Sequence, residues 1–142
     1  MVMYNEKVDF LSDFAMRTKA NLHHILAQDN KNDVYEVTQL INSLLGLVVF
    51  AKEHEARSDF RLHDIELKVG NDNETTTIIE HVRHALSHYH IRPIEDQGRV
   101  CGFKMWNGDG DINPKNWSRD FTVEELHEIA EEMCNQLTNG IQ

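Results

Sequence analysis

The sequence predicts an all-α fold, a four-helix up-and-down bundle with a small β-hairpin inserted between the third and fourth helices. Apolar residues recur at helical spacing in four separate segments. The period changes once, in a short stretch of aromatic and small residues before the last of these segments. At 142 residues, 40% of them hydrophobic, the chain is long enough for one helical domain with a single core, spanning residues 1–142.

The first helix is predicted from about Asn5 to Ala27, and a polar stretch with turn chemistry follows it at residues 29–33. The second is predicted from Asp33 or Val34 to about Glu53, where apolar residues follow the i, i+3, i+4, i+7 pattern over more than three turns. Gly46 inside this helix costs about 1 kcal/mol against alanine. It indicates either the close approach of a neighbouring helix or a tolerated defect.

Residues 56–73 have weak periodicity and are compatible with a short helix, a strand or an ordered loop. The third helix is predicted to start at residues 74–77 and to end at residues 87–90, because Pro93 disfavours helix in the residue before it. The hairpin follows, with strands at residues 99–106 and 116–121 around a turn at residues 107–111.

The fourth helix begins at a capping box formed by Thr122 and Glu125, and its apolar residues continue on one face to Leu137. The two tryptophans of the hairpin region, Trp106 and Trp117, suit either base stacking or packing of the hairpin. We favour packing.

The net charge of −10 argues against non-specific binding to nucleic acid or to anionic membranes, so neither DNA nor a membrane is an expected partner. The charge is uneven, and the middle of the chain carries enough arginine and lysine to form a local basic pocket. The N-terminus lacks the pattern of a signal peptide, and no apolar run approaches the roughly 20 residues of a membrane span. Two cysteines are too few for a disulfide framework. We expect a cytoplasmic protein.

The most distinctive stretch is the end of the third helix, where four histidines and an arginine lie within ten residues: His81, Arg83, His84, His88 and His90. Imidazole exchanges protons near neutral pH, and guanidinium is a permanently charged fork that matches phosphate oxygens. The stretch therefore allows three interpretations: a solvated polar face, a metal-binding stripe, or a site for phosphate chemistry such as RNA cleavage.

The metal interpretation depends on His81, His84 and His88, which lie at i, i+3 and i+7 on one helix face and suit zinc or nickel. The phosphate interpretation needs Arg83 and His88 to share a site. Five residues turn an ideal helix by about 500°, which leaves about 140° between the two side chains. They meet only if the helix loosens near Ser87, if the arginine wraps around, or if two chains associate as a dimer.

Residues 83–88, Arg-His-Ala-Leu-Ser-His, resemble the motif of HEPN domains (higher eukaryotes and prokaryotes nucleotide-binding). That motif is an arginine followed by a polar residue, with a histidine four to six residues after the arginine, near the end of the third helix of a four-helix bundle. The second predicted helix, residues 35–50, and the segment at residues 91–106 are similar to one plasmid-type HEPN subfamily. The resemblance covers roughly residues 8–138.

The resemblance implies a metal-independent endoribonuclease without a cofactor, acting as a homodimer in a toxin–antitoxin or phage-defence system. Carried over residue by residue, Arg83 and His88 are the catalytic pair and His84 is the supporting polar residue. RNA would be the substrate, and an antitoxin protein is a further partner. Two alternatives remain: a non-catalytic HEPN module that binds a nucleotide or a protein, and the metal-binding protein described above.

The sequence departs from the family pattern at one place. Some HEPN toxins carry, two residues after the motif histidine, a tyrosine that a partner nucleotidyltransferase modifies. That place is His90 here, and the tyrosine comes one residue earlier, at Tyr89. Tyr89 and Arg92 are kept as candidate substrate contacts.

Overall fold

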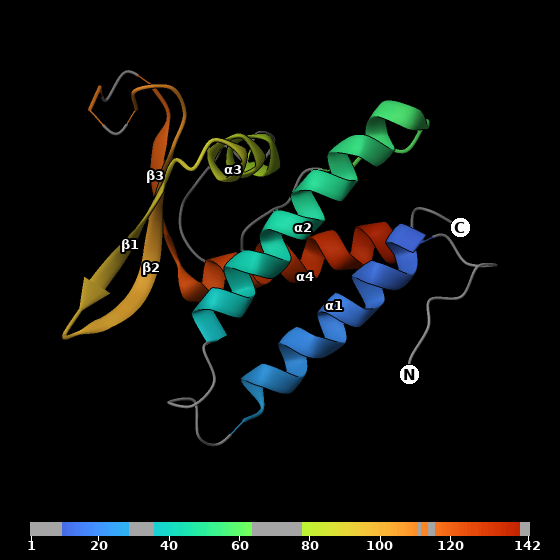
Figure 1. The fold of residues 1–142 in the computed structure, drawn as a ribbon, viewed down its shortest axis with the longest axis horizontal. Helices are drawn as coiled ribbons and strands as arrows, with labels where there is room; N and C mark the ends of the chain where they lie inside the picture. The colour runs from blue at the N-terminus through green and yellow to red at the C-terminus, as the bar shows by residue number, and fades with distance from the viewer. Residues whose placement is uncertain (1–9, 29–35, 64–77, 111, 114–115, 140–142) are drawn as a thin grey trace. The chain divides into compact units, whose positions relative to one another are not determined.

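The computed structural model describes residues 10–28, 36–63, 78–110, 112–113 and 116–139. This part of the chain holds four helices and a three-stranded antiparallel sheet. Figure 1 labels these elements on the ribbon. In chain order the elements are α1 (Phe10–Leu26), α2 (Glu36–Arg57), α3 (Ile78–Ser87), β1 (Ile91–Asp96), β2 (Arg99–Trp106), β3 (Ser118–Thr122) and α4 (Val123–Asn139). The mostly helical fold and the placement of the strands between α3 and α4 are confirmed.

The chain forms two compact units, which are described separately. The first contains residues 1–63 and 130–142, and the second contains residues 64–129. The predicted starts of the first three helices fall on residues outside the described ranges, as does most of the 56–73 segment. No helix in the described ranges is both long and apolar enough to cross a bilayer.

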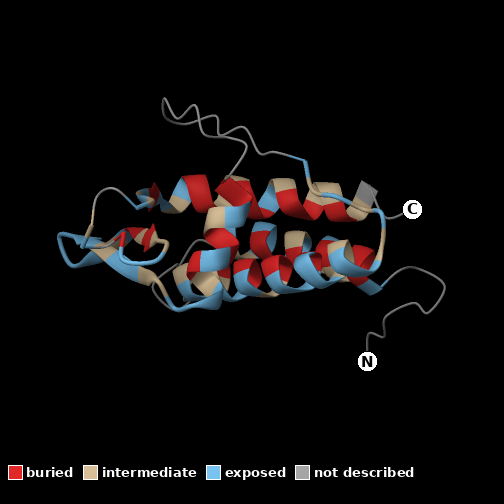
Figure 2. Ribbon diagram, turned by 90° about the horizontal axis from the view of Figure 1, so that it is seen from above, coloured by how far each residue is buried: buried red, intermediate tan, exposed pale blue. Residues whose placement is uncertain are grey.

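In the first unit, α1 packs on α2, and each buries one side, as the burial colours in Figure 2 show. Gly46 lies where the two helices meet, because a Cβ atom there would stand only 3.1 Å from the ring of Phe14. Of the two interpretations of this glycine, the structure supports close approach. Phe14 also makes an edge contact with Phe50, with ring centroids 5.1 Å apart.

Helix α2 ends at Arg57, four residues later than predicted, and this is a correction to the predicted end at Glu53. Side chains beyond the helix satisfy its last carbonyl groups, which normally lack partners. The Ser58 hydroxyl donates to the carbonyl of His54 at 2.8 Å, and Arg61 donates to the carbonyl of Glu55 at 2.8 Å. These caps extend a helix whose apolar periodicity has already faded.

The first unit also contains the buried thiol of Cys134 on α4. Burial raises the pKa of this thiol to about 12, and nearby Lys19 only partly offsets that effect. Cys134 is therefore protonated near neutral pH and acts as a small core residue. Cys101, in the second unit, is exposed.

In the second unit, α3 packs on β2, the central strand of the sheet. Its buried apolar residues, Ile78, Ile79, Val82 and Ala85, follow helical spacing, so one side of the helix faces the core. On the sheet, the core side chains include Phe103, Met105 and Phe121. This packing fixes the end of α3 beside the end of β2.

The predicted hairpin is the β2–β3 pair, and the sequence interpretation missed β1, so the two-stranded hairpin is corrected to a three-stranded sheet. β1 contains Pro93, which cannot donate to a ladder, but β1 is an edge strand, where proline is tolerated. The turn from β1 to β2 is a two-residue hairpin loop with positive φ at both positions, 52° at Gln97 and 78° at Gly98.

The start of α4 confirms the predicted capping box. The Glu125 carboxylate accepts from the backbone N–H of Thr122 at 2.9 Å, and the Thr122 hydroxyl accepts from the backbone N–H of Glu125 at 3.1 Å. Two N–H groups that the helix leaves unpaired are satisfied in this way. Arg119 donates to the second oxygen of the same carboxylate at 2.7 Å, which neutralises a buried charge.

Candidate active site

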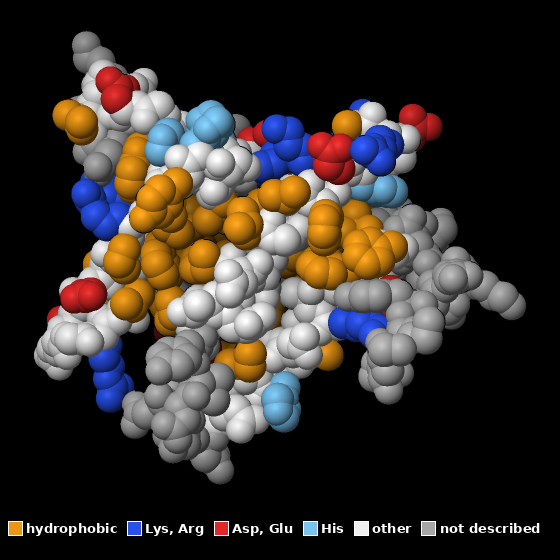
Figure 3. All heavy atoms as spheres, in the orientation of Figure 1, with side chains coloured by type: hydrophobic (Ala, Val, Ile, Leu, Met, Phe, Trp, Pro, Cys, Tyr) orange, Lys and Arg blue, Asp and Glu red, His pale blue; other side chains and the backbone are white. Residues whose placement is uncertain are grey.

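The last turn of α3 presents two imidazoles to solvent. His84 and His88 are exposed, whereas Val82, Arg83 and Ala85 are buried. The pattern follows from the helical period, because residues four apart project from the same side. Figure 3 shows histidine side chains gathered on the surface over α3.

A Schellman motif ends α3 immediately after these histidines. The backbone N–H of His90 donates to the carbonyl of Ala85 at 2.7 Å, and that of Tyr89 donates to Leu86 at 3.4 Å. Tyr89 has φ of 60°, the left-handed conformation that this motif requires. The chain reverses there and enters β1, which brings His90 back beside the residues it follows.

Three imidazoles come together at this reversal. The ring centroids of His84 and His88 lie 4.5 Å apart. The ring of His90 lies 5.9 Å from that of His88 and 6.1 Å from that of His84. We name His84, His88 and His90 the histidine cluster. Three imidazoles therefore lie close enough together to contact one small substrate group.

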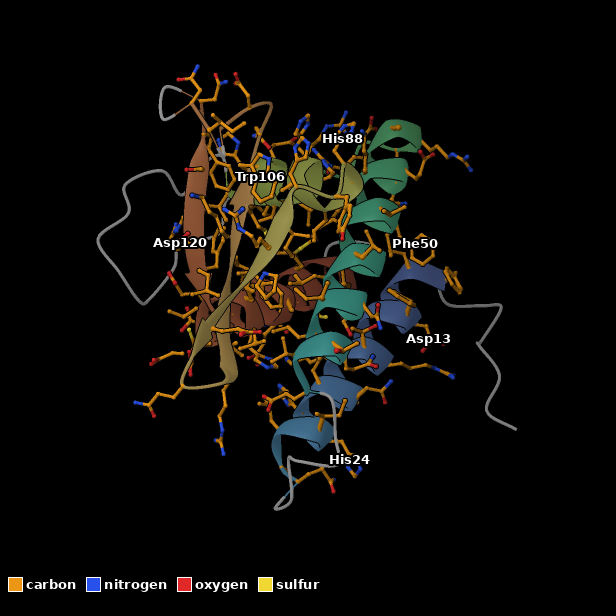
Figure 4. The ribbon with its side chains drawn as sticks, turned by 60° about the vertical axis from the view of Figure 1, so that its left-hand side comes forward. Asp13, His24, Phe50, His88, Trp106 and Asp120 are labelled. Atoms are coloured by element: carbon orange, nitrogen blue, oxygen red, sulfur yellow. The ribbon has the colours of Figure 1, made fainter. Side chains whose placement is uncertain are left out.

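Trp106, at the end of β2, supports one side of the cluster. Its ring stacks on His90 with an interplanar angle of 13° and a centroid distance of 5.5 Å. Arg92, on β1, places its guanidinium carbon 5.7 Å from the centroid of the same indole. Figure 4 labels Trp106 on its strand and His88 at the end of α3. Arg92, a predicted substrate contact, therefore adds positive charge beside the indole on which His90 stacks.

Arg83 is held inside its own helix. Its guanidinium forms an ion pair with Glu80, one turn earlier, and 11% of its side chain is exposed. The Glu80 side chain is 65% exposed, so the pair lies at the border between the core and solvent. The sequence interpretation did not anticipate Glu80, although an acid three residues before an arginine is a standard helical pairing.

Arg83 and His88 remain on different sides of α3. The backbone N–H of His88 donates to the carbonyl of His84 at 3.1 Å, the ordinary bond of an α-helix. The helix thus keeps its pitch through Ser87, and the loosening considered for that place is not found. The offset of about 140° between Arg83 and His88 persists. Of the ways to join the two groups, association of two chains needs no change in α3.

His81, the third member of the predicted metal stripe, belongs to a different contact. Its ring stacks on Trp117, with centroids 4.3 Å apart and planes 7° apart, and its Nδ1 accepts from the side-chain amide of Asn107. These contacts tie α3 to the loop before β3. In the described part of the chain, no group of three or more metal-ligating side chains has a suitable arrangement for a metal ion.

His90 and Trp106 are the site residues that the sequence interpretation passed over. The resemblance gives His90 no role of its own, and the sequence favours packing for Trp106. Both omissions follow from the missed strand β1. Its pairing with β2 places His90, the residue before β1, beside the indole, and the N–H of Trp106 donates to the carbonyl of His90 at 3.3 Å. The Gln97-Gly98 turn, which joins β1 to β2, is the sequence feature from which β1 could have been predicted.

Tyr89 provides a direct stability test of this geometry. Its side chain is 84% exposed, so its burial contributes little, while its left-handed backbone is unfavourable for a bulky residue. We expect Tyr89→Gly to raise the free energy of unfolding by about 0.5–1 kcal/mol, because relief of strain exceeds the entropy that glycine loses. Urea denaturation of the variant and of the unaltered protein measures this difference in the free energy of unfolding.

Ser87→Gly is the matched control for that measurement. Ser87 is exposed and lies in the last helical turn, where glycine is expected to cost about 0.5–1 kcal/mol. The two glycines should therefore shift stability in opposite directions. Equal losses from both variants would contradict the assignment of backbone strain to Tyr89.

A family model described as HEPN pEK499 p136 matches residues 1–140 of the chain. No curated protein and no solved structure matches significantly. The family match includes all of α3 and the histidine cluster.

Proposed function

Since this chain belongs to the HEPN pEK499 p136 family, we propose that it is a metal-independent endoribonuclease that cuts RNA through its own 2′-hydroxyl group. The observation that carries the proposal is the exposed His88, which lies next to two further imidazoles and directly after the short helix that carries Arg83. Phosphoryl transfer from a 2′-oxygen requires proton-exchanging groups and a cation that binds the phosphate.

In the proposed reaction, His88 takes the proton of the 2′-hydroxyl, and the freed oxygen attacks the adjacent phosphorus. The bond from phosphorus to the 5′-oxygen breaks, and that oxygen receives a proton. Arg83 binds the non-bridging phosphate oxygens and stabilises the charge that grows on them. His84, in ring contact with His88, supports its orientation. The products are a 2′,3′-cyclic phosphate and a 5′-hydroxyl.

The active form in this proposal is a homodimer. Arg83 and His88 lie about 140° apart around a helix that keeps its regular bonds, so one copy of α3 does not aim both at one phosphate. Two copies related by a twofold axis place the arginine of one beside the histidine of the other. We further propose that each chain folds as an up-and-down four-helix bundle and acts in the cytoplasm as a toxin or phage-defence component, restrained by an antitoxin protein.

The test is the chemistry of the cut ends. Purified protein, incubated with RNA in the presence of EDTA, is expected to leave 2′,3′-cyclic phosphate and 5′-hydroxyl termini, identified by mass spectrometry of short oligonucleotides. The same oligonucleotide with a 2′-O-methyl group at the cleaved position should stay intact. Ends with a 3′-hydroxyl and a 5′-phosphate, or cleavage that EDTA stops, would contradict the proposal.

A second function is favoured by one contact, the ion pair of Arg83 with Glu80. An arginine held by a carboxylate in its own helix serves equally well in a non-catalytic HEPN module that binds a nucleotide or a protein partner. Protein that leaves several RNAs uncut, yet gains thermal stability from a mononucleotide, would support this alternative.

A further inference from the structure

We infer that His90 is the second proton-transfer group of the site, an inference that rests on the proposed ribonuclease function. The cleavage described above moves two protons: one leaves the 2′-hydroxyl, and another must reach the departing 5′-oxygen. Arg83 cannot supply either transfer, because guanidinium does not lose its proton in proteins. If His88 takes one role, a second group of the site must take the other.

The distances within the histidine cluster select His90 over His84. Rings whose centroids lie 4.5 Å apart are in van der Waals contact, so His84 and His88 act as one contiguous surface. His90 stands 5.9 Å from His88. At that separation, nitrogens on the two rings can reach oxygens on opposite sides of one phosphorus, where the entering and leaving groups of an in-line displacement lie.

The backbone and the ring of His90 are both fixed. Its N–H is bonded to Ala85 and its carbonyl to the N–H of Trp106, at 2.7 and 3.3 Å. Its ring stacks on the indole of Trp106 within 13° of parallel. A group that transfers a proton must be held in a defined geometry, and these contacts hold His90 so.

Packing alone does not explain a histidine at this place. Among the described residues, Nδ1 of His90 is buried without a hydrogen-bond partner. Proteins avoid such atoms, and phenylalanine would stack on Trp106 equally well without one. The buried Nδ1 leaves Nε2 as the nitrogen that exchanges a proton with the substrate. Of the described titratable groups, His84 on α3 and His88 directly after it lie beside the ring, with centroids at 6.1 and 5.9 Å, and Arg92 on β1 contacts the indole on which the ring stacks.

The step is balanced without any further reactant. One imidazole accepts the 2′-hydroxyl proton as the bond from the 2′-oxygen to phosphorus forms. The other, already protonated, donates its proton as the bond from phosphorus to the 5′-oxygen breaks. Afterwards the two imidazoles have exchanged protonation states, and exchange with water restores them before the next turnover.

The decisive variant is His90→Phe, which keeps a flat ring for Trp106 and removes both nitrogens. We expect cleavage by this variant to fall by about 10²–10⁴-fold, the range typical of a lost general acid or base. The bell-shaped pH dependence of kcat/KM, expected when a base and an acid act together, should keep one limb and lose the other. The melting temperature should be unchanged or higher, because a buried unpaired nitrogen is removed.

His81→Phe is the matched control, because His81 is also a histidine of α3 stacked on a tryptophan, Trp117, and lies outside the cluster. Folded His81→Phe protein should cut RNA at a rate close to that of the unaltered protein and with both limbs of the pH profile. If His90→Phe does not fold, His90→Gln takes its place in the same assay.

The outcomes separate the two proposals. If His88→Ala loses cleavage while His90→Phe keeps the full rate and both limbs, the role of His90 is wrong and the proposed function stands. If the unaltered protein cuts no RNA, imidazole NMR with a 2′-O-methyl dinucleotide gives the answer. Shifts at His88 but not at His90 overturn the inference, and shifts at neither overturn both proposals.

Discussion

His88→Ala is expected to lose RNA cleavage by about 10²–10⁴-fold while its fold stays intact. His88 is exposed and lies just beyond the last helical residue, so its removal leaves neither a cavity nor a buried polar group without a partner. The loss should appear in kcat rather than in KM, because proton transfer acts only in the transition state. Initial rates on a fluorescent RNA oligonucleotide, at several substrate concentrations, give both constants.

Arg83→Ala is expected to lose cleavage by a similar factor for a different reason, because it removes the charge that stabilises the phosphate in the transition state. The partner it leaves, Glu80, has a side chain that is 65% exposed, so water replaces the lost ion pair. The cost in stability is then within the usual range of roughly 0.5–3 kcal/mol for one substitution. Arg83→Lys keeps the charge but not the planar fork, and should recover only part of the rate.

Two surface variants serve as matched controls. Arg57 is also paired with a glutamate one turn earlier, Glu53, and its side chain is 80% exposed at the end of α2. His24 is an exposed histidine near the end of α1. Arg57→Ala and His24→Ala should cut RNA normally. Normal cleavage by Arg83→Ala and His88→Ala, with circular dichroism showing every variant folded, would mean that the motif is not the active site.

The fold was predictable from the sequence where one local pattern decides the outcome. The boundaries of β2 and the capping box of α4 were found because alternation and the Thr122–Glu125 pair act within a few residues. Strand β1 was missed because its identity depends on pairing with β2 at the edge of a sheet, which makes Pro93 acceptable. The end of α2 was placed too early because its caps come from Ser58 and Arg61, beyond the periodic segment.

The candidate site divides in the same way. The side chains of α3 could be assigned to faces from the period alone, and the exposed His84 and His88 and the angular offset of Arg83 follow from it. The contact of His90 with Trp106 depends on the chain reversal at Tyr89. A left-handed tyrosine is rare enough that sequence reasoning does not expect one there. Contacts that depend on a chain reversal therefore cannot be predicted from the sequence until the fold is known.

Mixing two inactive variants is expected to distinguish most clearly between a site shared by two chains and a site within one chain. In a twofold dimer whose sites each combine Arg83 of one copy with His88 of the other, a hybrid of Arg83→Ala and His88→Ala has one site with both substitutions and one site with none. Random mixing makes about half of the dimers hybrids, each with one of two sites intact, so about one quarter of the normal activity should return. Neither variant alone should show this activity.

Co-expression of the two variants with different affinity tags, followed by purification through both tags in turn, isolates the hybrid for the rate measurement. The isolated hybrid should then reach about half the normal rate per dimer, since one of its two symmetric sites is complete. A hybrid that forms and stays inactive would place Arg83 and His88 of one chain in the same site. Because α3 keeps its regular hydrogen bonds through His88, that result would require substrate binding to reshape the helix end and release Arg83 from Glu80.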